Sequence, residues 1–209
     1  MSIQDTIVDI GYILLALNTI LFLRNYRLKL TSLKIFTLYL IGSLILQLYS
    51  SYLSDHKINN LFLSHYFFIG KFVLLSLFFR QILKKIILKK IISVVIIIVL
   101  VALCVYYIVY PTSYDKFNIF EIVLTSIPLI IFCFVFFIQQ IEGTESRYVF
   151  IVSGMFLYFL CSLLLYTAGN IKGSTKMLIW NTNAVLYILY QILIFVEWYK
   201  HFRKNPALT

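Results

Sequence analysis

The sequence predicts an all-α integral membrane protein, a bundle of seven transmembrane helices with the N-terminus outside and the C-terminus in the cytoplasm. Two observations lead to this fold class. First, the chain of 209 residues is 62% hydrophobic and only 12% charged, with a mean hydropathy of +0.95. A soluble domain carries roughly twice that share of charged residues. Second, thirteen of the eighteen Lys and Arg residues lie at alternate ends of seven apolar runs.

Each apolar run is close to the roughly 20 residues that a helix needs to cross a bilayer. The first run carries Asp9, is followed by basic residues and lacks a small-residue cleavage site, so we expect it to remain as a span. Short loops are predicted to join the spans into a single transmembrane domain that covers residues 1–209. The expected spans lie near residues 7–23, 35–54, 61–83, 91–110, 119–138, 148–169 and 177–198.

The orientation follows from the distribution of basic residues, because loops rich in Lys and Arg are retained in the cytoplasm. The predicted outer side carries only Lys57, Lys116, Lys172 and Lys176. The predicted inner side carries Arg24, Arg27, Lys29, Lys34, Arg80, Lys84, Lys85, Lys89, Lys90, Arg147, Lys200, Arg203 and Lys204.

The net charge of +10 would suggest nucleic-acid binding in a soluble protein. At the ends of apolar runs, however, basic side chains attract anionic lipid head groups. We therefore expect no nucleic-acid partner. The expected contact is with anionic head groups at the cytoplasmic face of the cell inner membrane.

A faint internal repeat relates the second and sixth spans. The segment from Tyr39 to Leu46 is similar to the segment from Tyr158 to Leu165, at an offset of 119 residues. Two interpretations remain open. The chain could contain a parallel duplication of three helices on each side of a joining fourth helix, a 3+1+3 arrangement, or leucine-rich helices could match by chance.

Polar side chains recur at helical spacing in the second, sixth and seventh spans. Because polar groups in lipid cost several kcal/mol unless they are partnered, they are expected to face inward. There they either hydrogen-bond neighbouring helices or line a polar cavity that opens to the outer side. The candidate residues of this ligand-binding cavity are Lys71, Asp9, Glu121, His65, Gln47, Tyr158, Asn183, Tyr187 and Gln191.

Lys71 is the basic residue that lies inside a predicted span, about ten residues from its outer end and so roughly 15 Å deep. A charge at this depth is costly and indicates a functional site. The carboxylates available in the outer half are Asp9 and Glu121. The alternatives are that Lys71 extends to the membrane surface or forms a purely structural ion pair. Near the inner end of the last span, Glu197 can pair with Lys200 or Arg80, and the simpler interpretation is an end-of-helix charge.

Catalytic and metal-binding patterns are not found in the sequence. The three histidines lack metal-ligand spacing, no Ser–His–Asp context occurs, and the three cysteines are isolated within apolar runs. We therefore expect no enzymatic activity, no metal and no cofactor. The residues concerned are His56, His65, His201, Cys104, Cys133 and Cys161.

Two segments resemble known sequences: Asn59-Asn60-Leu61 through His65-Tyr66 to Phe72, and Trp180-Asn181-Thr182-Asn183 through Tyr187 and Tyr190 to Lys200. They resemble uncharacterised short bacterial seven-span integral membrane proteins, some of which are encoded beside sensor histidine kinases. The resemblance implies an acidic residue at the position of Lys71 and a His at the position of Asn183. The chain departs from the pattern at both positions.

These observations favour a sensory or signalling module that acts through a cytoplasmic or membrane protein partner, since the short loops leave no room for an output domain. A small-solute transporter of the 3+1+3 type is the first alternative. The second alternative is an oligomeric accessory subunit or pore of a defence or envelope system.

Overall fold

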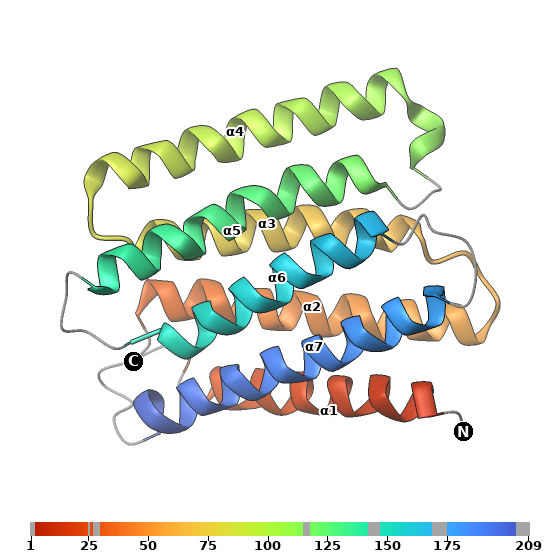
Figure 1. Ribbon diagram of the computed structural model, residues 1–209, viewed down its shortest axis with the longest axis horizontal. Helices are drawn as coiled ribbons and strands as arrows, with labels where there is room; N and C mark the ends of the chain where they lie inside the picture. The colour runs from red at the N-terminus through yellow and green to blue at the C-terminus, as the bar shows by residue number, and fades with distance from the viewer. Residues whose placement is uncertain are drawn as a thin grey trace. The chain divides into compact units, whose positions relative to one another are not determined.

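Seven long helices form the part of the protein that the computed structural model describes, residues 3–24, 26, 30–114, 118–141, 147–168 and 175–203. No strand occurs among these residues, and each long helix is long and apolar enough to cross a membrane. The prediction of seven apolar helices is therefore confirmed. The helices are α1 (Ile3–Leu23), α2 (Thr31–Asp55), α3 (Phe62–Ile82), α4 (Ile86–Val109), α5 (Ile119–Ile141), α6 (Val149–Ala168) and α7 (Thr175–Glu197), with short segments η2 (Pro111–Ser113) and η3 (Trp198–Phe202) (Figure 1).

The helix boundaries differ most from the expected spans at α4, which begins at Ile86 rather than at residue 91. Lys89 and Lys90, which were expected to lie outside the span, therefore belong to the first turns of this helix. Lysine is a good helix former, so the helix can continue past the apolar run into the head-group layer. At the other end of the chain, α7 passes into a π-helical turn, η3.

The helices fall into two compact units. The first unit contains Met1–Leu30 and Ile130–Thr209, and the second contains Thr31–Leu129, so that α5 is divided between them. This grouping differs from the division into three helices plus three that a 3+1+3 repeat implies. The repeat, the orientation in the membrane and the single-domain organisation remain predictions.

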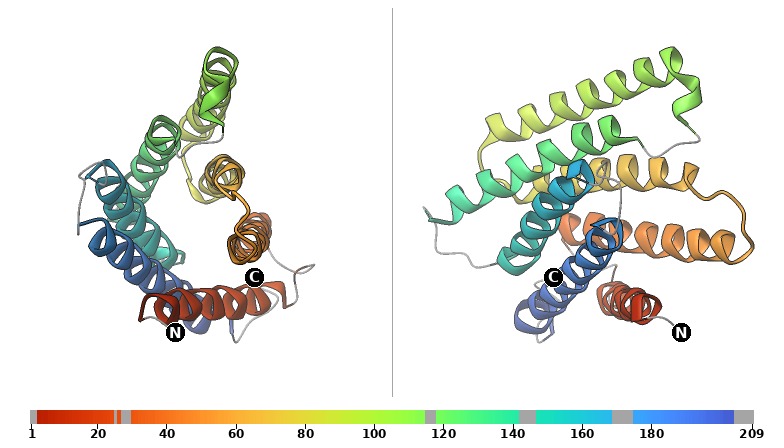
Figure 2. Two further views of the ribbon diagram at one scale, coloured as in Figure 1. Left: turned by 90° about the vertical axis from the view of Figure 1, so that its right-hand side faces the viewer. Right: turned by 45° about the vertical axis from the view of Figure 1, so that its right-hand side comes forward.

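In the second unit, α3 lies between α2 and α4 (Figure 2). Its buried face repeats at helical spacing and packs Phe72, Leu75 and Phe79 into the core, where all three are fully buried. By contrast, α4 exposes most of its apolar side chains, including Ile97 and Ile98. Exposed aliphatic residues on a helix of this length are expected to contact lipid.

In the first unit, α7 lies between α1 and α6 (Figure 2). The amide of Asn18 donates two 2.9 Å hydrogen bonds to Gln191, to its backbone oxygen and to its Oε1. Gly154 permits the close approach of α6 and α7, because a Cβ there would lie 2.8 Å from the buried ring of Tyr190. The Asn18 hydrogen bonds thus connect the first and last long helices, and Gly154 allows α6 and α7 to pack closely.

Glu197 is more than an end-of-helix charge. Its carboxylate is fully buried and accepts hydrogen bonds from the backbone N–H groups of Tyr148 at 2.6 Å and Phe150 at 2.9 Å. Its Oε1 also lies 2.8 Å from Nδ1 of His201, one turn further along the chain. The carboxylate therefore caps the start of α6, where backbone N–H groups have no partners within the helix.

Candidate functional site

A buried network of polar side chains lies in the second unit, where α3, α4, α5 and the α4–α5 connection meet. Its first member is His65, one turn inside α3. The start of this helix is shaped by a local turn, in which Asn59 Oδ1 accepts a hydrogen bond from the backbone N–H of Leu61 at 3.0 Å. His65 follows on the inward face, and only 3% of its surface is exposed.

Glu121 lies in the first turn of α5 and is fully buried. Asn118 Oδ1 accepts a 3.3 Å hydrogen bond from the backbone N–H of Glu121, which caps the helix. Thr125 Oγ1 donates to the Glu121 carbonyl oxygen at 2.8 Å, one turn later. The positive end of the helix dipole favours a negative charge at this position.

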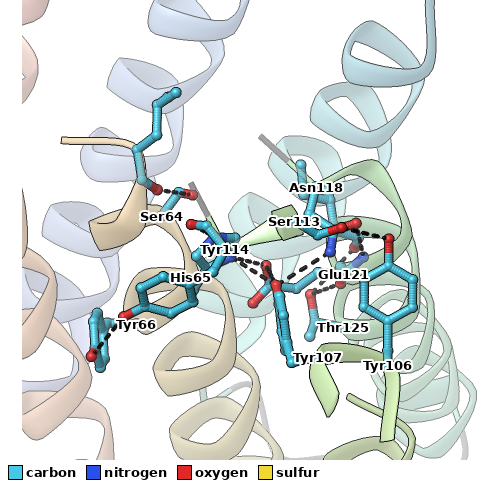
Figure 3. A network of polar contacts seen from close by, with 12 residues as sticks. Ser64, His65, Tyr66, Tyr106, Tyr107, Ser113, Tyr114, Asn118, Glu121 and Thr125 are labelled. Carbon is cyan, nitrogen blue, oxygen red and sulfur yellow. Dashed lines mark hydrogen bonds and ion pairs between the residues drawn. The ribbon is translucent and has the colours of Figure 1, made fainter. Parts of the chain in front are cut away.

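The side chains of His65, Glu121 and Tyr107 point toward one another (Figure 3). Glu121 Oε2 lies 2.5 Å from His65 Nδ1 and accepts a 2.8 Å hydrogen bond from the Tyr107 hydroxyl. That hydroxyl also lies 2.9 Å from His65 Nδ1 and accepts a 3.2 Å hydrogen bond from Asn118 Nδ2. The second ring nitrogen of His65 lies 2.8 Å from the backbone oxygen of Tyr114.

These contacts restrict where the hydrogens of the His65–Glu121 pair can lie. The Tyr114 carbonyl oxygen can only accept, so His65 Nε2 carries a hydrogen. A hydrogen bond between Nδ1 and Oε2 then requires a hydrogen on one of these two atoms, as in an imidazolium beside a carboxylate or a carboxylic acid beside an imidazole. In both forms the pair is electrically neutral. A second proton would have to bind Glu121 Oε1, which is buried without a hydrogen-bond partner.

Lys71 belongs to the same unit and lies six residues beyond His65 on α3, about 9 Å further along the helix axis. Its side chain is buried, with 6% of its surface exposed. The ammonium lies 4.9 Å from the ring centroid of Phe68 and 5.6 Å from that of Phe67. Lys71 also interacts electrostatically with Glu121. Burial disfavours the charge of Lys71, and the ring faces and the carboxylate offset part of that cost inside the unit.

The nine candidate residues fall into two groups. His65, Lys71 and Glu121 come together in the second unit, where Gln47 is half-buried on α2. The remaining five belong to the first unit. The single cavity that was expected to include all of them remains a prediction. The members of the first-unit group are Asp9, Tyr158, Asn183, Tyr187 and Gln191.

Within the first unit, the polar residues of α6 and α7 contact one another. Asn183 accepts a hydrogen bond from the Ser162 hydroxyl and donates a 3.1 Å hydrogen bond to the hydroxyl of Tyr166. Tyr158 and Tyr187 pack with ring centroids 5.5 Å apart. These contacts hydrogen-bond and pack neighbouring helices. Asp9 is exposed on α1.

Sequence reasoning missed Tyr107, Tyr114 and Asn118. Tyr107 lies at the end of an apolar run and supplies no periodic signal, and Tyr114 contributes its backbone oxygen, which no side-chain pattern can reveal. A signal did exist for Asn118. Asn followed three residues later by Glu is a helix-start signature, and Asn118 and Glu121 have this spacing.

Comparison with known proteins gave no match, since no protein-family model, curated protein or solved structure matches the chain. Its class therefore follows from its own residues. Seven apolar helices of membrane-spanning length make the chain a multi-pass membrane protein.

Proposed function

We propose that this membrane protein is a sensory module whose input is a change in protonation of the His65–Glu121 pair and whose output is passed to a protein partner. The proposal rests on one observation: His65 Nδ1 on α3 lies 2.5 Å from Glu121 Oε2 on α5, a contact that needs a hydrogen on one of the two atoms. The Tyr107 hydroxyl, on α4, donates a hydrogen bond to the same oxygen of Glu121. The protonation of one buried site therefore controls contacts among three helices.

The position of the network suits a sensor. His65 lies in the second turn of α3, Glu121 in the first turn of α5 and Tyr107 near the end of α4. All three are close to the connection that contains η2, at one end of these helices. A proton from the adjacent aqueous phase needs to travel only a short distance to reach the pair.

Both changes in proton count weaken the contact. Removal of the hydrogen between the two atoms would leave a nitrogen lone pair of His65 facing an oxygen lone pair of Glu121 at 2.5 Å. Addition of a second proton would neutralise the carboxylate and leave an imidazolium without its counter-charge. Because unpaired buried charges are costly, the helix ends are then expected to separate and admit water.

The experiment places a fluorine label on a cysteine at the exposed position of Thr112, in a background without other cysteines, and records ¹⁹F NMR spectra in nanodiscs. Wild-type protein should change its spectrum when the pH is changed, because a change in the proton count of the pair is expected to weaken the contact between α3 and α5. His65→Ala should abolish the change, whereas His56→Ala, in an exposed turn, should preserve it. A wild-type spectrum that is constant with pH, or a change that persists in His65→Ala, would contradict the proposal.

The same measurement must account for the other titratable groups that face the pair. These are Tyr107 from α4, Lys71 from α3 and Tyr114, whose ring stacks on His65 with centroids 5.2 Å apart. Tyr107→Phe and Lys71→Met therefore serve as companion variants. If the pair is the input, both variants should shift the midpoint of the spectral change but retain it.

One observation also favours the transporter alternative. Glu121 Oε1 is buried without a partner, and Lys71 lies deeper in the same unit, so a proton could pass between a carboxylate and an amine. Proton flux into proteoliposomes loaded with a pH-sensitive dye separates the two functions. A sensor should give no flux above that of empty vesicles. A flux that Glu121→Gln abolishes would establish transport instead.

A further inference from the structure

We infer that a basic pocket between the end of α3 and the start of α4 binds the phosphate group of an anionic membrane lipid. The pocket has a volume of about 670 Å³. It lies at the opposite end of α3 from His65 and is separate from the polar network. Its lining consists of Arg80, Gln81, Ile86, Lys89, Lys90, Ser93 and Val94.

The pocket carries three positive charges and no carboxylate. Arg80 is in the last turn of α3, and Lys89 and Lys90 are in the first turns of α4. None of these three side chains forms an ion pair with a residue that the structure describes. The sequence has no Asp or Glu between Asp55 and Asp115, so neighbouring residues of the chain cannot neutralise them.

The geometry of these cations suits a phosphate. A guanidinium presents a planar pair of donors that matches two phosphate oxygens, and lysine ammonium groups bind phosphate as point charges. Ile86, the first residue of α4, lines the pocket, so the positive end of the helix dipole lies at this end of the helix. Together these groups surround an anion with donors and offer no competing acceptor charge.

The apolar part of the lining favours a lipid over a soluble phosphate. Ile86 is 71% exposed and Val94 is 53% exposed, and both line the pocket beside the cations. An aliphatic wall next to a cationic site matches a molecule that joins a phosphate to acyl chains. Because the pocket lies where two membrane-crossing helices end, it is at the depth of lipid head groups.

The experiment is native mass spectrometry of the delipidated full-length protein titrated with phosphatidylglycerol or with zwitterionic phosphatidylcholine. Wild-type protein should bind phosphatidylglycerol more tightly than phosphatidylcholine. The variant Arg80→Gln/Lys89→Gln/Lys90→Gln should bind it on the order of 100-fold more weakly, at roughly fivefold for each charge removed. The control Lys200→Gln/Arg203→Gln/Lys204→Gln removes the same residue types elsewhere and should retain wild-type affinity.

Three results would overturn the inference. Equal losses in both triple variants would show that only overall surface charge matters. Competition by inorganic phosphate at the same concentration as the lipid would identify a soluble anion as the ligand. A photoactivatable phosphatidylglycerol that crosslinks wild-type protein outside residues 80–94 would place the site elsewhere, and this measurement needs no variant to fold.

Discussion

His65 Nδ1 lies 2.5 Å from Glu121 Oε2, although 56 positions separate the two residues in the chain. This contact connects the starts of α3 and α5 within the second unit. It gives the protein a buried pair of ionisable side chains in hydrogen-bonding contact.

The first prediction is that His65 and Glu121 stabilise the protein jointly. His65→Ala and Glu121→Ala should each lower the free energy of unfolding by about 3 kcal/mol or more, because each leaves a buried group unpaired. The double variant should cost less than the sum of the two, as measured by unfolding in mixed micelles. Glu121→Gln should cost less than Glu121→Ala, since its amide can donate to Nδ1. Strictly additive losses would contradict the pairing.

The second prediction concerns Lys71 and depends on Glu121. In the native background, Lys71→Leu should destabilise the protein by about 1–3 kcal/mol, because it removes the cation that interacts with the buried carboxylate. In a Glu121→Gln background the same substitution should be neutral or stabilising, because a buried charge is then replaced by an apolar side chain. Lys57→Leu, in the exposed α2–α3 turn, should have little effect in either background. Equal effects of Lys71→Leu in both backgrounds would disprove the coupling.

The third prediction concerns the packing of α6 against α7. Gly154→Ala should reduce the free energy of unfolding by about 1–3 kcal/mol, because the added methyl group would lie 2.8 Å from the Tyr190 ring and 3.3 Å from Leu193 Cβ. Gly42→Ala is the matched control, since no atom lies within 4 Å of a Cβ at that position in α2. Thermal unfolding in detergent should separate the two variants, and indistinguishable melting temperatures would contradict the close approach.

The fourth prediction concerns the cap that Glu197 provides for α6. Glu197→Ala should cost about 2–4 kcal/mol, because it leaves the N–H groups of Tyr148 and Phe150 without their acceptor. Hydrogen exchange at residues 148–151 should accelerate at the same time, which identifies the site of the damage. Asp55→Ala, at the exposed end of α2, should change neither quantity. Normal protection at the start of α6 in Glu197→Ala would refute the cap.

The fifth prediction is the orientation in the membrane. In a background without native cysteines, a cysteine at Lys57 should react with a membrane-impermeant maleimide in intact cells. A cysteine at Lys85 should react only after the membrane is permeabilised, because the basic turn between α3 and α4 is expected in the cytoplasm. The reverse pattern would invert the topology and place the basic pocket at the outer face.

The number and approximate limits of the helices could be read from the sequence because lipid imposes a simple rule. A segment that crosses hydrocarbon must satisfy its backbone internally and present apolar side chains, so each span leaves a long apolar run. The rule fails at α4, where Lys89 and Lys90 extend the helix beyond its apolar part. Hydropathy measures contact with lipid, whereas a helix ends where its backbone hydrogen bonds end.

From the sequence, the site could be predicted only as a set of charged and polar residues whose burial in the membrane costs free energy. Burial cost identified Lys71, and Glu121 was named as one of its two available carboxylates, but His65 was not expected to contact Glu121. Tyr107 and the Tyr114 backbone oxygen carried no signal, since their role depends on a contact with a ring from another helix. Which buried polar groups hydrogen-bond one another depends on their distance in the folded structure, and the sequence does not contain that distance.

The sequence by itself determined that the chain is a membrane protein of seven helices, because hydrophobic length and charge are local properties of the chain. Tertiary structure decided that a carboxylate in the first turn of α5 lies 2.5 Å from a ring nitrogen of a histidine on α3. It also decided that Arg80 and Lys89 line one pocket. The physical reason is that a hydrogen bond or a binding pocket depends on positions a few ångströms apart, which only the packing of helices can bring together.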